Sequence, residues 1–226
     1  RLWRVSAGVL RWLWYLLVCV PSLNRRQVTQ TVGRLKMNNS AQKAQSIVGT
    51  NKGMNNGVER PELDFYPTPR RGTSALLEVE TFEGDIWECA CGDGMMGKVL
   101  EEKYKVVSTD IEPRGYGSEL DFLKSADLLA PNIVTNPPFV IAQEFAEHAL
   151  GLGCNKLALL CKLAFLEGVA RSSWLETTPL KAVYVFKRRL KFTRNGDENI
   201  KGGGMIAFAW FVWERGYSGK PMVEWL

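Results

Sequence analysis

A short apolar run followed at once by closely spaced glycines limits what this chain can fold into. Residues 86–91 (IWECAC) read as a buried strand, and Gly92-Asp93-Gly94 follows without a break. Residues 98–102 (KVLEE) then have the composition of a helix. Glycine permits positive φ and lets a ligand approach bare backbone, so the order strand, glycine turn, helix predicts the opening of a nucleotide-binding βαβ unit.

A second strand is predicted at 106–110 (VVSTD), with Asp110 at its tip. Asp110 follows Gly92 at about the spacing at which a carboxylate meets ribose hydroxyls. A strict GxGxxG match over 92–97 points to NAD or FAD, but such a match is weak evidence by itself. The competing interpretation is a cofactor without a pyrophosphate, which needs close backbone approach more than an anion cradle.

The tetrapeptide Asn136-Pro137-Pro138-Phe139 ends another strand-like run, 133–135 (IVT). Proline neither extends a helix nor donates to a sheet ladder, so the strand ends here with a stiff backbone. The pinned Asn136 side chain and a proline carbonyl can both accept from an exocyclic amine, and Phe139 can cover a ring face. The pattern suits a planar group that bears an amine. An ordinary strand-to-loop exit is the alternative, because proline-rich loops are common.

The order of these segments resembles the motif order of a known family. The run Glu88-x-x-x-Gly92-x-Gly94 is similar to the first motif of class I S-adenosylmethionine methyltransferases. The tetrapeptide resembles the catalytic motif of compact adenine-N6 DNA methyltransferases of phages and bacteria, some of which belong to restriction-modification systems. Segments 64–69 (DFYPTP) and 121–122 (DF) match further motifs, so the resemblance covers roughly residues 60–226. Related tetrapeptides occur in enzymes that methylate ribosomal RNA guanine or a protein glutamine.

The resemblance implies S-adenosylmethionine as cofactor and transfer of its methyl group to adenine N6 in duplex DNA. The adenine would be flipped out of the helix, and no metal ion would take part. The residues assigned to the cofactor are Tyr66, Thr68, Pro69, Glu88, Cys91, Gly92, Gly94, Asp110, Ile111, Asp121, Phe122 and Asn136. The residues assigned to catalysis are Asn136, Pro137, Pro138 and Phe139. RNA guanine N2, a protein glutamine, or a non-catalytic DNA-binding role remain the alternatives.

Charge is distributed unevenly along the chain. The net charge is +5, but residues 1–60 hold ten Lys/Arg and one acid, so residues 61–226 carry a net negative charge. Binding of nucleic acid by the predicted catalytic domain therefore needs a local basic patch. The candidate is the run 187–194 (KRRLKFTR); its cations are Lys187, Arg188, Arg189, Lys191 and Arg194. A solvated hairpin end is the alternative.

Cysteine and histidine usage gives no sign of a metal site. The five cysteines (Cys19, Cys89, Cys91, Cys154 and Cys161) lack the paired spacing of a zinc cluster. They read as small buried residues in a reducing, cytoplasmic compartment of a bacterium or phage-infected cell. The single histidine, His148, lies on a predicted helix, 142–150, and reads as a packing or surface residue.

The first 59 residues differ in character from the rest. Residues 10–20 (LRWLWYLLVCV) are apolar but shorter than the roughly 20 residues that span a bilayer. Residues 22–59 are polar with little periodicity, which is typical of a poorly structured segment. We expect an over-extended reading frame, with translation starting at Met54 or Met37. A membrane-surface or DNA-binding arm is the alternative.

The remaining pattern predicts the fold class. Strands are expected at 156–165, 182–186 and 205–213, with a helix at 166–175. The last two strands, joined by the glycine-bearing loop 195–204, predict an antiparallel hairpin. The result is a Rossmann-like α/β fold: a mostly parallel seven-stranded sheet with a C-terminal antiparallel hairpin and helices on both faces. Only short loops, chiefly 112–119 and 187–204, are left to recognise a target sequence.

Overall fold

The computed structural model of this chain describes residues 67–112, 114–192 and 206–226. The predictions for the segment 1–59, for Tyr66 and for Arg194 lie outside these residues, as does the glycine-bearing loop 195–204. The helices are α4 (Arg70–Val79), α5 (Met95–Leu100), α6 (Ala142–Leu152) and α7 (Val169–Leu175). The short 3-10 helices are η2 (Phe122–Lys124), η3 (Phe139–Ile141) and η4 (Leu163–Leu166). No helix among the described residues is long and apolar enough to cross a membrane.

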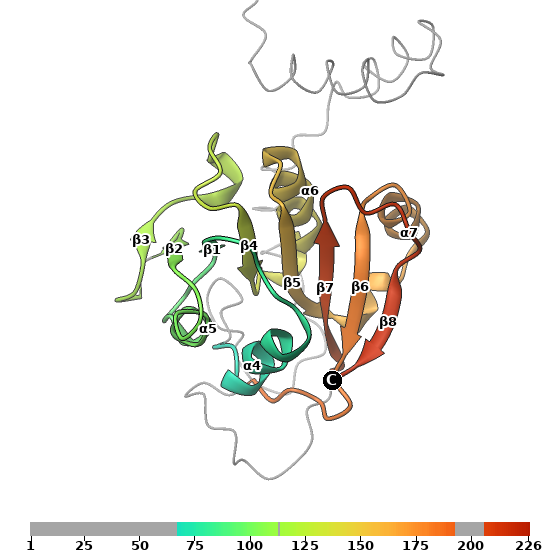
Figure 1. Ribbon diagram of the computed structural model, residues 1–226, viewed down its shortest axis with the longest axis horizontal. Helices are drawn as coiled ribbons and strands as arrows, with labels where there is room; N and C mark the ends of the chain where they lie inside the picture. The colour runs from blue at the N-terminus through green and yellow to red at the C-terminus, as the bar shows by residue number, and fades with distance from the viewer. Residues whose placement is uncertain (1–66, 113, 193–205) are drawn as a thin grey trace, which may run out of the picture. The chain divides into compact units, whose positions relative to one another are not determined.

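A single mixed sheet runs through the described part of the chain, in the order β3-β2-β1-β4-β5-β7-β6-β8 (Figure 1). The strands are β1 (Ile86–Glu88), β2 (Val106–Asp110), β3 (Ser118–Glu119), β4 (Asn132–Thr135), β5 (Lys156–Lys162), β6 (Leu180–Val185), β7 (Phe208–Glu214) and β8 (Met222–Trp225). All neighbouring pairs are parallel except the two that β7 makes. The predicted α/β class, with a mostly parallel sheet and a C-terminal hairpin, is confirmed.

The C-terminal part of the sheet differs from the prediction in detail. The predicted hairpin of β6 and β7 is present, but β7 inserts between β5 and β6 instead of forming a reversed edge. An eighth strand, β8, adds to β6 in parallel and forms the edge, with Trp225 paired to Val185. The periodicity at 222–225 gave no signal for it, because all four residues are exposed.

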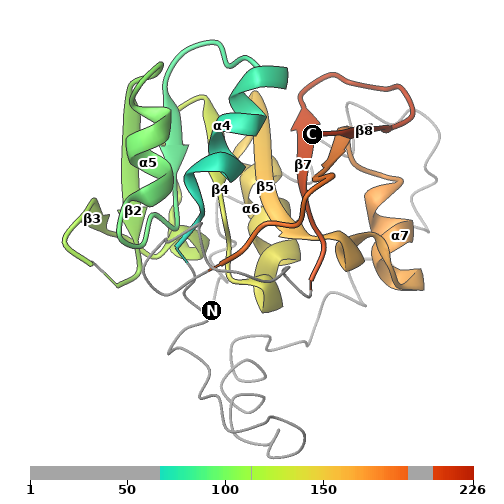
Figure 2. The same cartoon turned by 90° about the horizontal axis from the view of Figure 1, so that it is seen from below.

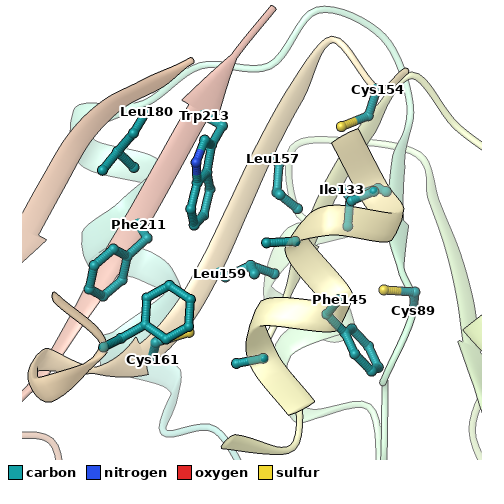
Figure 3. Close-up of a cluster of buried hydrophobic side chains, with 14 of the residues drawn as sticks. Cys89, Ile133, Phe145, Cys154, Leu157, Leu159, Cys161, Leu180, Phe211 and Trp213 are labelled. Carbon is teal, nitrogen blue, oxygen red and sulfur yellow. The ribbon is translucent and has the colours of Figure 1, made fainter. Parts of the chain in front are cut away.

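Helices cover both faces of the sheet, as predicted (Figure 2). Leu76 of α4 and Leu100 of α5 pack on one face, against β-strand residues such as Val134 and Trp210. Phe145 of α6 packs on the other face, near Cys89, in a cluster that also includes Ile133 and Cys161 (Figure 3). Adjacent residues of a strand point to opposite faces, so strands buried on both sides read as continuous apolar runs. This is why their positions could be predicted from the sequence.

The predicted long strand and helix over 156–175 are interrupted. The strand β5 ends at Lys162, and η4 follows directly. Gly168, with φ of +98°, separates η4 from α7. The apolar residues of η4 imitate a strand in sequence because Phe165 is buried against Phe211 and Trp174. The break at Lys162 brings that side chain to the carboxyl end of the sheet.

A buried ion network lies at the opposite end, where β5 and β6 begin. The Glu80 carboxylate is 3% exposed and accepts from Lys156 Nζ at 2.6 Å and from the Tyr184 hydroxyl at 2.7 Å. Lys181 lies 3.5 Å from Glu80 and 2.8 Å from Glu214. This network joins the C-terminus of α4 to three strands, because each charge has more than one partner.

We expect Glu80→Ala to lower the free energy of unfolding by about 3 kcal/mol, because it leaves the ammonium of Lys156 buried without its closest partner. Glu102→Ala is the matched control. The Arg70–Glu102 pair has the same 2.6 Å separation but side chains 58% and 50% exposed, so its loss should cost less than about 1 kcal/mol. Urea denaturation measures both values. Equal values for the two variants would contradict a structural role for the Glu80 network.

Candidate functional site

The predicted site residues gather at one edge of the sheet. Strands β2, β1, β4 and β5 are adjacent and parallel, so their carboxyl ends lie along the same edge, where ligands bind in open α/β sheets. Asp110 ends β2, the glycine turn follows β1, Asn136 follows β4 and Lys162 ends β5. The two predicted motifs, glycine turn and tetrapeptide, therefore follow neighbouring strands.

The glycine turn is tied to the tip of β2 by the Asp110 carboxylate. Gly92 and Gly94 have φ of +54° and +80°, the left-handed region that favours glycine. The Gly92 N–H donates to Asp110 Oδ2 at 2.8 Å, and the Glu112 N–H donates to Asp110 Oδ1 at 2.9 Å. Asp110 thus has a structural partner on each oxygen, and each carboxylate oxygen can accept a second hydrogen bond. Ile111, next in sequence, is 58% exposed at the same point.

The aromatic ring of Tyr116 packs against the backbone of this turn, at the glycines. A Cβ added at Gly94 would lie 2.3 Å from the Tyr116 ring, and one added at Gly97 would lie 2.5 Å from its hydroxyl. The hydroxyl donates to Glu101 Oε1 at 2.7 Å, and burial raises the pKa of Tyr116 to about 12. Gly94 and Gly97 therefore make room for a side chain of this chain. Tyr116 was not predicted from the sequence. A usable signal was its place between Gly115 and Gly117, in the seven residues that join β2 to β3.

Glu88 is a buried acid behind the glycine turn. Its side chain is 2% exposed, and Oε2 has no hydrogen-bond partner among the described residues. Burial raises its pKa well above the usual range, and the nearby charges of Asp110 and Asp93 raise it further. An unpaired buried carboxyl oxygen in an acidic neighbourhood is suited to a positively charged ligand.

Asn136 is held by the upstream segment that the sequence analysis singled out. Its Nδ2 donates to Thr68 Oγ1 at 3.1 Å, and Thr68 is 5% exposed. Because Thr68 accepts from the amide nitrogen, the amide is oriented with Oδ1 pointing away from Thr68. Pro137 is buried, and the Ile141 N–H donates to the Pro138 carbonyl at 3.1 Å, which starts η3. The structure thus brings together two predicted motifs that lie 68 residues apart.

The ring of Phe139 lies between an aromatic and a cation. Its centroid is 5.4 Å from that of Phe208, and Lys162 Nζ lies 4.8 Å from it over the ring. Phe192 packs on Phe208 in turn, with centroids 4.6 Å apart. Lys162 was not predicted from the sequence, because a single cation at the end of a buried strand belongs to no recognisable motif.

The predicted cofactor residues Asp121 and Phe122 have clear local roles. Asp121 accepts from the Leu123 N–H at 3.1 Å as the cap of η2, and its carboxylate pairs with Lys124 at 2.7 Å. Phe122 is 2% exposed and packs edge-on against Trp87 and His148. Cys91 is also buried, with its Sγ 3.5 Å from the Tyr116 carbonyl oxygen. A cofactor contact by Asp121, Phe122 or Cys91 stays a prediction.

The predicted basic run lies beside the tetrapeptide's anchor. Arg71 donates to the Arg188 and Arg189 carbonyl oxygens at 2.8 Å and 3.3 Å, which docks the loop after β6 on the start of α4. Between them is a hollow of about 240 Å³. Its lining residues are Pro69, Arg71, Arg188, Arg189, Leu190 and Lys191. Pro69, which lines this hollow, directly follows Thr68 in the sequence. The basic loop therefore lies close to the residue that holds Asn136.

The remaining predicted cysteine and histidine positions fit packing roles. Cys89, Cys91, Cys154 and Cys161 are buried free thiols. His148 packs against Phe122, and burial lowers its pKa. Within residues 67–112, 114–192 and 206–226, no three His, Cys, Asp or Glu side chains gather as a metal site would require.

A scan against protein-family models finds no matching family, and a search of curated proteins finds no significant match. Solved structures do match. A putative RNA methyltransferase from Pyrococcus horikoshii is 14% identical, with a TM-score of 0.53, over 77% of this chain and 98% of its own. A modification subunit of a putative type I restriction enzyme from Vibrio vulnificus is 13% identical, with a TM-score of 0.49, over 88% of this chain and 51% of its own.

A type I restriction-modification methyltransferase subunit from Streptococcus thermophilus is 11% identical, with a TM-score of 0.47, over 67% of this chain and 45% of its own. This chain therefore spans only about half the length of the two restriction-modification subunits. The likeness to the Pyrococcus structure is one of fold. With the sheet order, it confirms the Rossmann-like class I methyltransferase fold.

The buried Glu88 predicts a specific pH dependence of stability. Its pKa is raised in the folded state, so above about pH 4.3 the unfolded chain loses the proton first. Stability is then lost as pH rises towards the folded pKa, by up to about 1.4 kcal/mol per pH unit. Glu88→Gln removes this loss, so in urea denaturation the variant should gain on the wild type as the pH rises above the unfolded pKa of about 4.3. Glu78→Gln, exposed on α4, controls for the lost charge; parallel stability curves for Glu88→Gln and wild type would contradict the assignment.

Proposed function

We propose that this protein transfers a methyl group from S-adenosylmethionine to the N6 amine of adenine in DNA. The observation that carries the proposal is the anchored amide of Asn136. It stands at the carboxyl end of β4, oriented by Thr68 and followed by two prolines and an aromatic ring. A rigid acceptor next to a ring is the arrangement needed to hold a planar amine.

Asn136 and the tetrapeptide backbone would position the acceptor nitrogen. Asn136 Oδ1 and the Pro137 carbonyl would accept the two amine hydrogens, which draws the nitrogen lone pair out of conjugation with the ring. An amide is neutral at any working pH, so Asn136 orients and polarises the amine instead of removing a proton. Holding the nitrogen in line with the methyl group lowers the activation barrier of the transfer, because the two reactants are already in position.

Phe139 would stack on the flipped base, in exchange for the contact that its ring makes with Lys162. Stacking of a base on an aromatic side chain contributes about 1–3 kcal/mol. The base must displace Lys162 from the ring face that it covers, at a cost of about 0.5–2 kcal/mol for a half-buried cation–π contact. Stacking therefore offsets this cost first, and any remainder offsets part of the few kcal/mol needed to flip the base.

The residues around the glycine turn fit the proposed cofactor. When bound, S-adenosylmethionine supplies an electrophilic methyl group on a sulfonium centre. Its positive charge would favour the ionised form of Glu88, whose Oε2 is buried without a described partner. Asp110 would accept from the ribose hydroxyls, and the exposed side chain of Ile111 would lie against the adenine ring. The turn at Gly92 allows the backbone to approach the ligand closely.

The basic loop after β6 supports a nucleic-acid acceptor. Arg188 and Arg189 are exposed and belong to the hollow next to Pro69, on the same sheet edge as Asn136. Phosphate contacts by such a loop would hold the duplex without reading its sequence. An RNA acceptor is the second candidate, because the Pyrococcus protein of the same fold is described as a putative RNA methyltransferase.

We expect Asn136→Ala to abolish methyl transfer and to lower the affinity for S-adenosylmethionine far less, because the acceptor loses its partner whereas the segment around Thr68 loses one neutral hydrogen bond. Transfer of labelled methyl to unmethylated duplex DNA, with nucleoside analysis, measures the first quantity. Isothermal titration measures the second. N6-methyladenine made by the wild type alone supports the proposal. Turnover retained by the variant would contradict the role of Asn136, and label appearing only in RNA would favour the second candidate.

Asp110→Ala should have the opposite effect. Loss of the carboxylate removes the predicted ribose contact and frees the Gly92 N–H, so we expect cofactor affinity to fall about tenfold, the equivalent of one hydrogen bond to a charged group. Isothermal titration with S-adenosylhomocysteine provides the measurement. Glu112→Ala, two residues away and exposed, is the matched control. Affinity equal to that of wild type in Asp110→Ala would rule out the ribose role.

A further inference from the structure

A second hollow is lined by Phe139. It has a volume of about 160 Å³ and lies between η3, the end of β5 and the start of α7. Two aromatic rings line it, Phe139 and Phe165, and so do two cations, Lys162 and Arg171. No motif of the sequence includes Phe165, Lys162 or Arg171. The hollow nonetheless adjoins the ring on which the acceptor base would stack.

The two cations of this hollow rest on its aromatic walls. Lys162 Nζ lies 4.8 Å from the centre of the Phe139 ring, and the Arg171 guanidinium carbon lies 4.8 Å from the centre of the Phe165 ring. Gln143 Oε1 accepts from Arg171 Nε at 3.5 Å. Both cations are half-buried, and among the described residues no carboxylate forms an ion pair with either.

This differs from the cations at the opposite edge of the sheet. Lys156 and Lys181 are similarly buried, but each pairs with both Glu80 and Glu214. Partly buried cations without an acidic partner are costly to keep in a fold. Two of them converging beside a stacking ring indicate a site for an anion that arrives with a base.

We propose that Lys162 and Arg171 bind the backbone phosphate of the acceptor nucleotide while its base stacks on Phe139. The inference rests on the proposed function and assigns a phosphate subsite to it. The planar guanidinium of Arg171 presents parallel N–H donors that match two phosphate oxygens. Lys162 leaves the Phe139 ring face when the base takes it, and its flexible stem carries the ammonium to the same phosphate.

The subsite links stacking of the flipped base on Phe139 to binding of its phosphate. In the free protein Lys162 covers the Phe139 ring, so a base that stacks there displaces the ammonium, and a phosphate on the same nucleotide gives the ammonium a new partner. A free base would displace Lys162 without offering it a new partner. The subsite therefore predicts preference for a nucleotide in a strand over an isolated base, independent of the basic loop after β6.

The test is the salt dependence of binding of fluorescent single-stranded oligodeoxyadenylate to the full chain. A single strand needs no recognition sequence and its bases are already accessible. Each phosphate contact contributes about 0.7 to the slope of log affinity against log salt. Because both cations contact one phosphate, the double variant Lys162→Gln/Arg171→Gln should reduce the slope by about 0.7 and weaken binding. Lys162→Arg/Arg171→Lys keeps both charges and should retain the wild-type slope.

The control Lys105→Gln/Lys220→Gln removes the same charge from exposed residues that precede β2 and β8, at the far edge of the sheet. Its slope should stay within about 0.3 of that of wild type. Cofactor affinity and the thermal midpoint report whether each variant is folded. If wild type and the Lys162/Arg171 double variant bind with the same slope, the subsite is refuted and the proposed function stands. If the wild type does not bind nucleic acid at all, the subsite and the proposed function are both refuted.

Discussion

The parallel register of β2, β1, β4 and β5 is the constraint on which the site depends. Ile86 pairs with both Val106 and Asn132, and Asn132 pairs with Lys156, so four strands run in step and end at one edge. A one-residue slip of any of them would turn its buried side chains to the wrong face. The hydrophobic packing that fixes the register therefore also fixes the positions of Asp110, Gly92, Asn136 and Lys162.

Much of this fold could be predicted from the sequence because its strands are buried on both faces. Runs such as residues 157–161 and 208–213 are apolar throughout, and glycines and prolines mark where the chain turns. The strand β8 could not be predicted, because its four residues are exposed and alternate in no useful way. The order of β7 and β6 could not be predicted either, since it depends on which strand's edge is available and not on local pattern.

The candidate site shows the same division between local and non-local information. The glycine turn and tetrapeptide are local, and both were found. The contact of Asn136 with Thr68 was not predicted, although both residues were singled out, while Tyr116 and Lys162 were missed altogether. These side chains matter through neighbours that the tertiary fold supplies. Glycine spacing in particular was read as room for a ligand, yet Gly94 and Gly97 make room for Tyr116.

The separation of the two sheet edges has a consequence for how such a protein can change over time. The ion network of Glu80, Lys156 and Lys181 lies where the parallel strands begin, and the chemistry lies where they end. Substitutions in the loops after β5 and β6 therefore leave that network intact. New acceptor preferences can arise there by ordinary drift, without each step first requiring a compensating change that restores folding.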